Sequence, residues 1–118
     1  MTNEVDFFEI GTSDPAASQA FYGGLFGWEF SDPTPAAYRY VNGREGGLWD
    51  SSATGGDNYA VFYVHVDDVE ASLDEAVALG ARVVIPFVDN GQIQFAHLAD
   101  PQGSRFAIWR RIGEETAS

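Results

Sequence analysis

The 118-residue sequence contains no cysteine and no lysine. Without cysteine the chain can form no disulfide, no thiolate nucleophile and no cysteine-ligated metal site. Its six basic residues are all arginines, and against 18 acidic residues they leave a net charge of −12. Because a phosphate-binding surface needs clustered lysine and arginine, we expect no nucleic-acid partner.

Long apolar runs are also missing. No apolar stretch approaches the roughly 18 residues of a membrane-spanning helix. The first residues, MTNEVDFF, have neither the basic region nor the apolar core of a signal peptide. We therefore expect no membrane partner and a cytoplasmic location. A hydrophobic content of 45%, with 14% aromatic residues, argues against disorder and for a single domain with a buried core.

One local pattern occurs twice. In the first copy an apolar run, 7–10, precedes Asp14-Pro15, a favoured N-cap followed by a favoured first helical residue. In the second copy an apolar run, 61–66, precedes the cap candidate Asp68. Asp14 and Asp68 are 54 residues apart (68 − 14), as are Ser18 and Ser72 (72 − 18). The repeat predicts two similar supersecondary modules rather than a solenoid, which needs at least about three copies.

Each module is predicted to have the order β-α-β-β-β. The dipeptides Asn42-Gly43 and Asn90-Gly91 predict hairpin turns, because both residue types tolerate positive φ. The first module, 5–50, has predicted strands at 5–10, 28–31, 38–41 and 44–49 and a helix at 15–26. The second module, 59–111, has predicted strands at 59–66, 82–88, 92–98 and 104–111 and a helix at 68–79. A Ser/Gly/Asp-rich linker, 51–58, joins them, and the fold class is α+β.

Helical stripes and strand alternation sort the side chains into two faces. Ala17, Phe21 and Leu25 recur at helical spacing and predict that this side of the first helix packs on the sheet. Phe62 and Val64 suit the side of the sheet under the second helix. Alternation then places the following residues on the opposite, helix-free face: Phe7, Glu9, Tyr63, His65, Phe95, His97, Arg105 and Trp109.

Aromatic rings with a few polar groups are typical of a small-molecule pocket. The alternative is that the helix-free face is an ordinary amphipathic surface in contact with water. Gly46-Gly47, which interrupts a predicted strand, has two interpretations of its own: a β-bulge, or a place where the backbone lies close to a ligand.

Three segments carry a family resemblance: TSDPAASQAFYGGLFGWEF in the first module, and VHVDDVEASLDEAVALGARVV and LADPQGSRFAIW in the second. Together these segments resemble the vicinal oxygen chelate superfamily. This superfamily includes glyoxalase I, extradiol dioxygenases, and the bleomycin and fosfomycin resistance proteins. The resemblance implies a single domain in which the modules form a cup-shaped mixed sheet, with helices on its outer face. It also implies a homodimer, since members commonly complete or cap that cup with a second chain.

The superfamily's metal enzymes carry His, Gln or Glu at four strand positions, and this sequence departs from that pattern. By resemblance those positions are occupied here by Phe7, Val61, Ala107 and a residue near Gly47–Trp49. None of these side chains has the O, N or S donor that a divalent ion needs. We therefore expect no metal and no other cofactor. A relocated site using Glu9, His65 and His97 stays open, because His and carboxylate are suitable donor types.

Two functional hypotheses from different classes follow. The first is a metal-independent small-molecule-binding protein of the glyoxalase/bleomycin resistance type. Its ligand would contact Phe7, Trp49, Val61, Tyr63, Phe95, Arg105 and Trp109. The second is a metal-free lyase, isomerase or hydrolase that uses Glu9, His65 or His97 as the general acid or base. A third, plainer interpretation is a domain whose pocket has no function. The sequence shows no nucleophile–base pair that decides among them.

Overall fold

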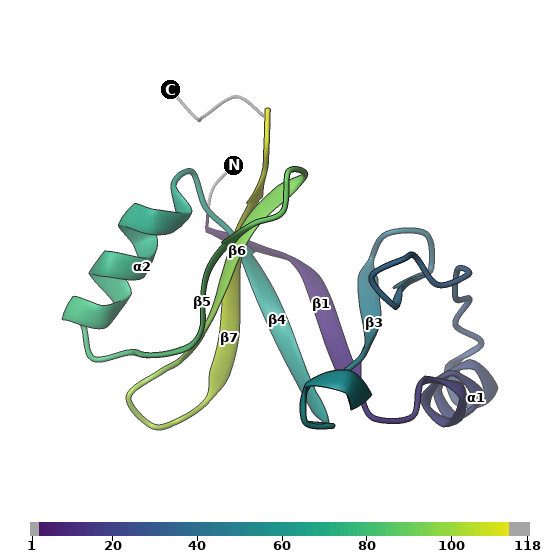
Figure 1. The fold of residues 1–118 in the computed structure, drawn as a ribbon. Coiled ribbons are helices and arrows are strands. Elements are labelled where there is room, and N and C mark those ends of the chain that lie inside the picture. Colours follow the sequence, from purple (N-terminus) through teal and green to yellow (C-terminus); the bar gives the residue numbers. More distant parts are fainter. Residues whose placement is uncertain (1–2, 114–118) are drawn as a thin grey trace. The chain divides into compact units, whose positions relative to one another are not determined.

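The computed structural model describes residues 3–113, which form seven strands, two helices and one short 3-10 turn (Figure 1). The elements are β1 (Glu4–Thr12), α1 (Pro15–Phe26), β2 (Tyr38–Val41), β3 (Gly46–Asp50), η1 (Ser52–Thr54), β4 (Tyr59–His65), α2 (Val69–Ala78), β5 (Arg82–Asp89), β6 (Ile93–Ala99) and β7 (Arg105–Arg111). This mixed sheet with two helices confirms the predicted α+β class. Neither helix in the described part is both long and apolar enough to cross a membrane.

The chain divides into two compact units. The N-terminal unit is Phe7–Val61, and the C-terminal unit comprises, of the described residues, 3–6 and 62–113. Strands β1 and β4 each contribute residues to both units. Asp6 and Glu9 therefore belong to different units although they lie on the same strand.

Both helices begin where the sequence predicts, and for the predicted reason. Oδ1 of Asp14 accepts a hydrogen bond from the backbone N–H of Ala17 at 3.1 Å, and Oδ1 of Asp68 accepts one from Ala71 at 3.0 Å. Each carboxylate thereby satisfies a backbone donor that has no partner inside its helix. Helix α1 ends at Gly27, whose φ of 70° is a left-handed conformation that glycine adopts without steric cost.

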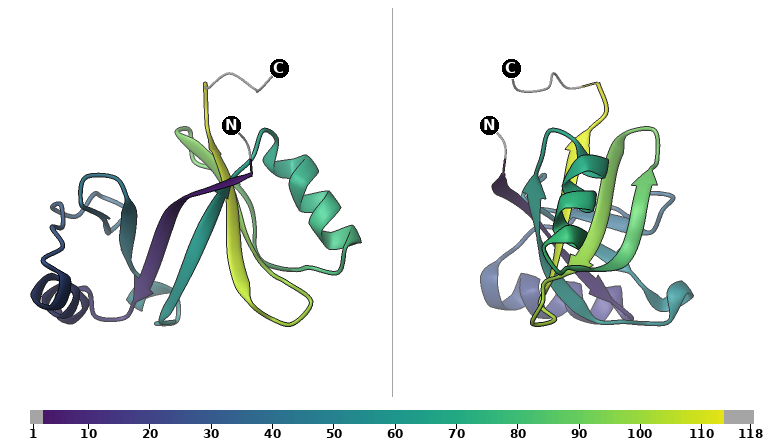
Figure 2. Two further views of the ribbon diagram at one scale, coloured as in Figure 1. Left: turned by 180° about the vertical axis from the view of Figure 1, so that it is seen from behind. Right: turned by 90° about the vertical axis from the view of Figure 1, so that its left-hand side faces the viewer.

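In the C-terminal unit, α2 covers one face of a four-stranded sheet with the order β4-β7-β6-β5 (Figure 2). Strand β4 runs parallel to β7, and β7 and β5 each pair antiparallel with β6. The buried core between α2 and this sheet consists of Val66, Val69, Ala96, Leu98 and Ile108. The prediction that Phe62 lies under α2 is wrong. Phe62 is 47% exposed, because its ring stacks on Phe106 at the margin of the core instead of beneath the helix.

In the N-terminal unit, the strand order is β2-β3-β1, with β1 parallel and β2 antiparallel to β3. The predicted strand at 28–31 is reduced to an isolated bridge between Phe30 and Val41. Pro33 and Pro35 follow directly, and since proline has no backbone N–H, a longer ladder has no donors there. The Asn42-Gly43 turn is present, with φ of 50° and 83°. Its loop runs to residue 45, so β3 begins at Gly46 rather than at residue 44.

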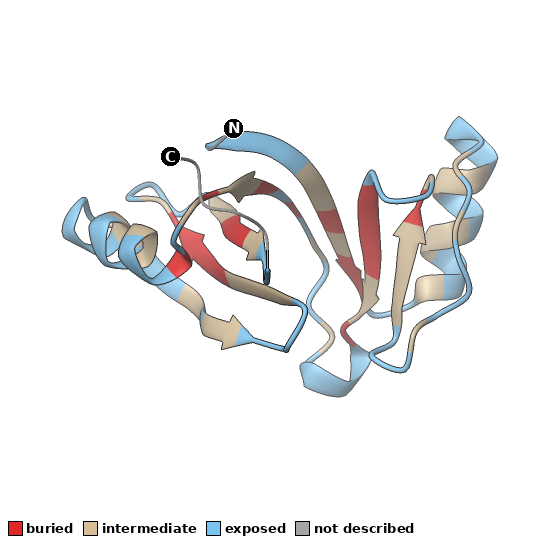
Figure 3. Ribbon diagram, turned by 90° about the horizontal axis from the view of Figure 1, so that it is seen from above, coloured by how far each residue is buried: buried red, intermediate tan, exposed pale blue. Residues whose placement is uncertain are grey.

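Helix α1 faces the other way from its predicted orientation. The stripe that includes Ala17, Phe21 and Leu25 is exposed, and no residue of α1 is buried (Figure 3). The helix contacts its unit through Tyr22, whose ring stacks on Trp28 at 5.4 Å between ring centroids. Trp28 in turn lies 5.4 Å from Phe8 on β1. Aromatic stacking therefore sets the inner side of this helix, and apolar spacing alone does not reveal it.

Candidate functional site

Strand register places most of the predicted site residues of the C-terminal unit on one face of its sheet. His65 pairs with Trp109 across β4 and β7, and Phe95 pairs with Trp109 across β7 and β6. Paired residues in adjacent strands point to the same side of a sheet. This face lies opposite α2, and we call it the C-terminal aromatic face. It comprises Tyr63, His65, Phe95, His97, Arg105 and Trp109.

The rings of this face form a continuous series. Phe95 and His97 lie 5.9 Å apart between ring centroids, and His97 and Tyr63 lie 5.4 Å apart. Tyr63 and Trp109 follow at 6.4 Å, and Trp109 and His65 at 5.5 Å. Most of these contacts are edge-to-face, an arrangement favoured by the ring quadrupoles. The series therefore forms a preorganised aromatic surface rather than a set of isolated rings.

His97 is held as a neutral imidazole. Arginine only donates hydrogen bonds, so Nη2 of Arg105 donates to Nδ1 of His97 across 3.2 Å. Nδ1 therefore carries the lone pair, Nε2 carries the proton, and Nε2–H donates to the hydroxyl oxygen of Tyr63 at 2.7 Å. Burial, with the positive charge of Arg105 as a second cause, lowers the pKa of His97 to about 4. This geometry makes His97 a fixed polar group rather than a mobile proton carrier.

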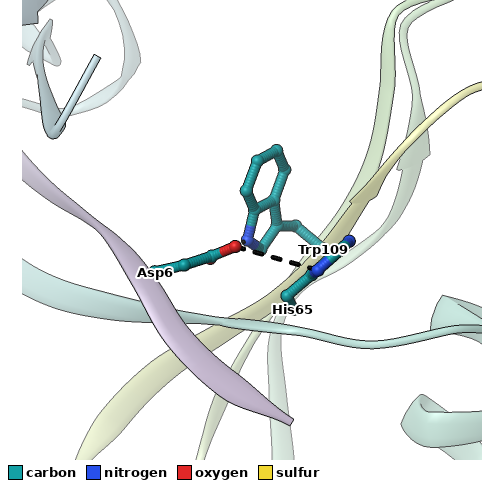
Figure 4. Close-up of polar contacts among 3 residues, drawn as sticks. All are labelled: Asp6, His65 and Trp109. Carbon is teal, nitrogen blue, oxygen red and sulfur yellow. Dashed lines mark hydrogen bonds and ion pairs between the residues drawn. The ribbon is translucent and has the colours of Figure 1, made fainter. Parts of the chain in front are cut away.

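Asp6 joins His65 and Trp109 through its two carboxylate oxygens (Figure 4). Oδ1 accepts the indole N–H of Trp109 at 2.8 Å, and Oδ2 lies 3.8 Å from Nδ1 of His65. Arg111 stacks its guanidinium over the Trp109 ring at 4.5 Å from the centroid. A carboxylate beside Nδ1 favours the tautomer with its proton on that nitrogen, which leaves the Nε2 lone pair available for acid–base chemistry.

Sequence reasoning missed Asp6. Alternation along β1 assigned Phe7 and Glu9 to the helix-free face and thus placed Asp6 on the opposite side. The contacts of Asp6 with His65 and Trp109 show that its carboxylate reaches the C-terminal aromatic face. The sequence feature that could have pointed to Asp6 is its acidic side chain near the start of β1, a strand expected to contribute to a pocket.

The accessible part of the C-terminal aromatic face is narrow. Tyr63, His97 and Trp109 are only 4%, 1% and 6% exposed, so they form its base. The side chains of His65 and Asp6 retain 19% and 33% exposure. A ligand on this face would meet those two side chains and the half-buried Phe95 first.

Glu9 belongs to the N-terminal unit, whereas His65 and His97 belong to the C-terminal unit. Its Oε1 accepts a hydrogen bond from the Tyr38 hydroxyl at 2.9 Å, and its Oε2 accepts one from the Tyr59 hydroxyl at 2.6 Å. Glu9 is 7% exposed, so a nearly buried carboxylate is held by two phenols. An ionised carboxylate only accepts hydrogen bonds, and these two donors match that requirement. Sequence reasoning identified Glu9 but neither of its tyrosine partners.

Two glycines make room for those tyrosines. A Cβ atom at Gly47 would collide with the Tyr38 ring and hydroxyl, and one at Gly11 would collide with the Tyr59 ring. Gly46 likewise leaves space for Phe8. The β-bulge interpretation of Gly46-Gly47 is therefore wrong, and the interpretation that the backbone lies close to a ligand stays a prediction. The register runs unbroken through both residues, so there is no bulge, and aromatic side chains of the chain itself take the space beside them.

The remaining predicted contacts also belong to the N-terminal unit. Trp49 pairs with Tyr38 across β2 and β3, and its indole N–H donates to the backbone oxygen of Ala36 at 3.2 Å. Alternation along β1 places Phe7 on the same face as Glu9. Val61 is 4% exposed. The hypothesis that Phe7, Trp49 and Val61 contact a ligand stays a prediction.

The donor set does not fit the divalent metal of the superfamily's enzymes. Phe7, Val61, Ala107 and the segment Gly47–Trp49 offer no side-chain donor that binds such an ion. Within residues 3–113, no three His, Asp or Glu side chains converge into a group that could hold one. Of the relocated site's residues, Glu9 belongs to the N-terminal unit and His65 and His97 to the C-terminal unit, and Nδ1 of His97 already accepts a hydrogen bond from Arg105.

An open groove of about 690 Å³ lies in the N-terminal unit, on the side of α1. Its lining includes Gln19 and Gly23 of α1, Trp28, and Arg39 of β2. It is open to solvent, and its lining does not include Glu9. We therefore place the candidate site on the helix-free faces rather than in this groove.

This chain belongs to the glyoxalase-like domain family, whose model matches residues 7–109. A solved structure, described as a glyoxalase/bleomycin resistance protein/dioxygenase superfamily member from Vibrio splendidus 12B01, has the same fold. It gives a TM-score of 0.61 at 19% identity and covers 90% of this chain and 97% of that chain. Together these findings confirm the superfamily resemblance, and at this identity the structural likeness shows the fold alone.

The chain is also similar to curated proteins, two of which carry different names. It is 28% identical to "Putative glyoxylase CFP32" of Mycobacterium tuberculosis over 130 residues, covering 92% of this chain and 47% of that protein. It is 31% identical to the anthracycline biosynthesis protein DnrV of Streptomyces peucetius over 127 residues, covering 89% of this chain and 46% of that protein. The chain thus spans about half the length of these two relatives.

Proposed function

We propose that this protein is a metal-independent small-molecule-binding protein whose ligand lies on the C-terminal aromatic face. The observation that carries the proposal is the unbroken series of rings from Phe95 to His65, with centroid distances between 5.4 and 6.4 Å. Polar groups of Asp6 and Arg105 flank this series and are fixed by hydrogen bonds. A mostly aromatic surface with a few oriented polar groups is the usual composition of a ligand site.

The proposed ligand is a planar aromatic compound. The partly exposed rings of Phe95 and His65 can stack on a fused-ring system, and Tyr63, His97 and Trp109 lie beneath them as the buried base. Membership of the glyoxalase-like family supports a small-molecule ligand. The relative DnrV is named for anthracycline biosynthesis, and anthracyclines contain a planar fused-ring chromophore. Metal independence is supported by the lack of donor atoms at the positions where the superfamily's enzymes bind their ion.

Equilibrium dialysis with the neutral probe 1,4-dihydroxyanthraquinone tests this proposal. Protein treated with a chelator should bind the probe saturably, with one site per chain, and added divalent metal should not change the affinity. Phe95→Ala should weaken binding by roughly tenfold through lost stacking. The control Phe26→Ala removes an aromatic ring that is 58% exposed on α1, and it should leave the affinity unchanged. Absence of saturable binding, or binding that requires a metal, would contradict the proposal.

Proton-transfer catalysis by His65 is the second candidate function. The observation that favours it is the Asp6 carboxylate, whose Oδ2 lies 3.8 Å from Nδ1 of His65. At this distance its charge favours the Nδ1–H tautomer, although it is longer than the hydrogen bond of an orienting carboxylate. In this role His65 would accept a proton through Nε2, and a lyase, isomerase or hydrolase would result. The candidate requires the Nδ1–H tautomer of His65, which histidine ¹⁵N chemical shifts measure. A predominant Nε2–H tautomer would exclude it.

We also propose that the chain forms a homodimer. Support comes from the superfamily resemblance, since members commonly complete or cap the cup-shaped sheet with a second chain. Light scattering at micromolar concentration should give about twice the 12.8 kDa of one chain. A mass of one chain would refute this proposal without affecting ligand binding.

A further inference from the structure

The helix-free face of the N-terminal unit gathers four aromatic rings around one buried carboxylate. Glu9 pairs with Gly47 across β1 and β3, and Gly47 pairs with Tyr40 across β3 and β2. Tyr38, Trp49 and Tyr59 belong to the same face, by register or by contact with Glu9. All four rings are half-buried, so part of each is accessible. We call this surface, made of Glu9, Tyr38, Tyr40, Trp49 and Tyr59, the Glu9 face.

Specific contacts hold the Glu9 carboxylate beneath the rings. Burying a carboxylate at 7% exposure is costly unless donors satisfy it, and here two phenol hydroxyls do so at 2.9 and 2.6 Å. Gly11 and Gly47 leave the space that the two phenol rings occupy. The backbone is thus shaped to hold both tyrosines over Glu9.

A phenol that donates to an anion becomes more electron-rich, because hydrogen-bonded groups polarise one another. The ring faces of Tyr38 and Tyr59 therefore gain attraction for a positive charge. A cation on this face is already present within the chain. The guanidinium of Arg44 lies 4.5 Å from the centroid of the Tyr40 ring. The other arginine of this hairpin, Arg39, pairs with Leu48 and so points to the opposite face.

We propose that the Glu9 face binds an organic ammonium cation. The cation would rest on the rings of Tyr38, Tyr40, Trp49 and Tyr59, and the Glu9 carboxylate would supply the opposite charge. This inference rests on the proposed function in that both sites would belong to one small-molecule-binding protein. It adds the charge of a ligand group, which the C-terminal aromatic face does not specify.

The test compares choline with 3,3-dimethylbutan-1-ol, its neutral isostere, by NMR of the tryptophan indole N–H signals. Trp49 reports the Glu9 face, Trp109 the C-terminal aromatic face, and Trp28 the side of α1. Choline should shift the Trp49 signal saturably at millimolar concentration and leave Trp28 unchanged. The neutral alcohol should bind about tenfold more weakly, the size expected of a cation–π contact. Equal affinities, or no choline-dependent shift of Trp49, would overturn the proposal.

Two variants distinguish the effect of the Glu9 carboxylate on choline binding from the effect of the chain's net negative charge. Glu9→Gln keeps the side-chain shape and should abolish the preference for choline over the alcohol. Glu75→Gln, at an exposed position of α2, makes the same change in net charge and should retain the preference. Loss of the preference in both variants would assign it to overall charge and overturn the role of Glu9. If the anthraquinone probe shifts Trp109 while choline leaves Trp49 unchanged, the cation site fails and the proposed function stands.

Discussion

Arg105 and His97 form a hydrogen bond in which a permanently charged guanidinium faces an imidazole nitrogen across 3.2 Å. Protonating that imidazole would place a second positive charge beside the first, in a site where His97 is 1% exposed. Burial and this like charge together lower the pKa of His97 to about 4. The folded protein therefore excludes a proton that the unfolded chain accepts near the ordinary histidine pKa of about 6.5.

The free energy of unfolding should consequently depend on pH in a defined window. Between about pH 6.5 and pH 4 the unfolded chain binds a proton at His97 and the folded protein does not. Stability should therefore fall as the pH falls through this range, by about 3 kcal/mol in total for this residue. Denaturant titrations of the wild type and of His97→Gln measure the difference, and the variant should lose this dependence. The matched variant His65→Gln should keep it. A His97 pKa near 6.5 by NMR titration would contradict the assignment.

Gly47→Ala should destabilise the protein by about 1–3 kcal/mol, because the added methyl group collides with Tyr38. In a Tyr38→Ala background the same substitution should cost much less, since the colliding ring is gone. Gly24→Ala is the control. Gly24 lies in α1 with nothing close to its added Cβ, so alanine there should raise stability by up to about 1 kcal/mol. Equal effects of Gly47→Ala in both backgrounds, measured by chemical denaturation, would disprove the packing of Tyr38 on Gly47.

The corrected position of Phe62 gives a further prediction. Leu98 is fully buried between α2 and its sheet, so Leu98→Ala should cost about 2–5 kcal/mol through the cavity it leaves. Phe62 is 47% exposed and stacks on Phe106, so Phe62→Ala should cost about 1 kcal/mol. Thermal or chemical unfolding of the two variants distinguishes the positions. A loss at Phe62 as large as that at Leu98 would restore Phe62 to the core.

Two substitutions of Asp6 separate its two contacts. Asp6→Asn retains an oxygen for the Trp109 indole N–H but removes the charge that faces His65. Asp6→Leu removes both, leaving an indole donor buried without its acceptor at a cost of about 1–3 kcal/mol. Hydrogen exchange of the Trp109 indole should therefore accelerate in Asp6→Leu and change little in Asp6→Asn. The tautomer of His65 should respond to both variants. Unchanged exchange in Asp6→Leu would show that the bond to Trp109 is unimportant in solution.

The fold was predictable wherever local chemistry decides it. The caps at Asp14 and Asp68 and the positive-φ glycines of the two Asn-Gly turns depend on neighbours within a few residues, and the structure confirms them. Strand alternation likewise placed Tyr63, His65 and Trp109 together because β4 and β7 pair in a regular register.

The parts that sequence reasoning missed depend on long-range contacts. Trp28, on which Tyr22 of α1 stacks, lies against Phe8, 20 residues away (28 − 8), and Tyr59 reaches Glu9 from 50 residues away. The pairing of Asp6 with Trp109 spans 103 residues. No periodicity within one segment encodes such contacts. The glycines at 11 and 47 were visible in the sequence, but their role becomes clear only when the tyrosine rings beside them are placed.

The most direct test of ligand binding on the C-terminal aromatic face uses the three tryptophan indole signals of chelator-treated protein during titration with 1,4-dihydroxyanthraquinone. We expect the Trp109 signal to shift saturably, because its indole is bonded to Asp6 at the base of that face. The Trp28 signal should stay fixed, since its ring packs against Phe8 and Tyr22 on the side of α1. A saturable shift confined to Trp28, or no shift of Trp109 at full occupancy, would contradict the account.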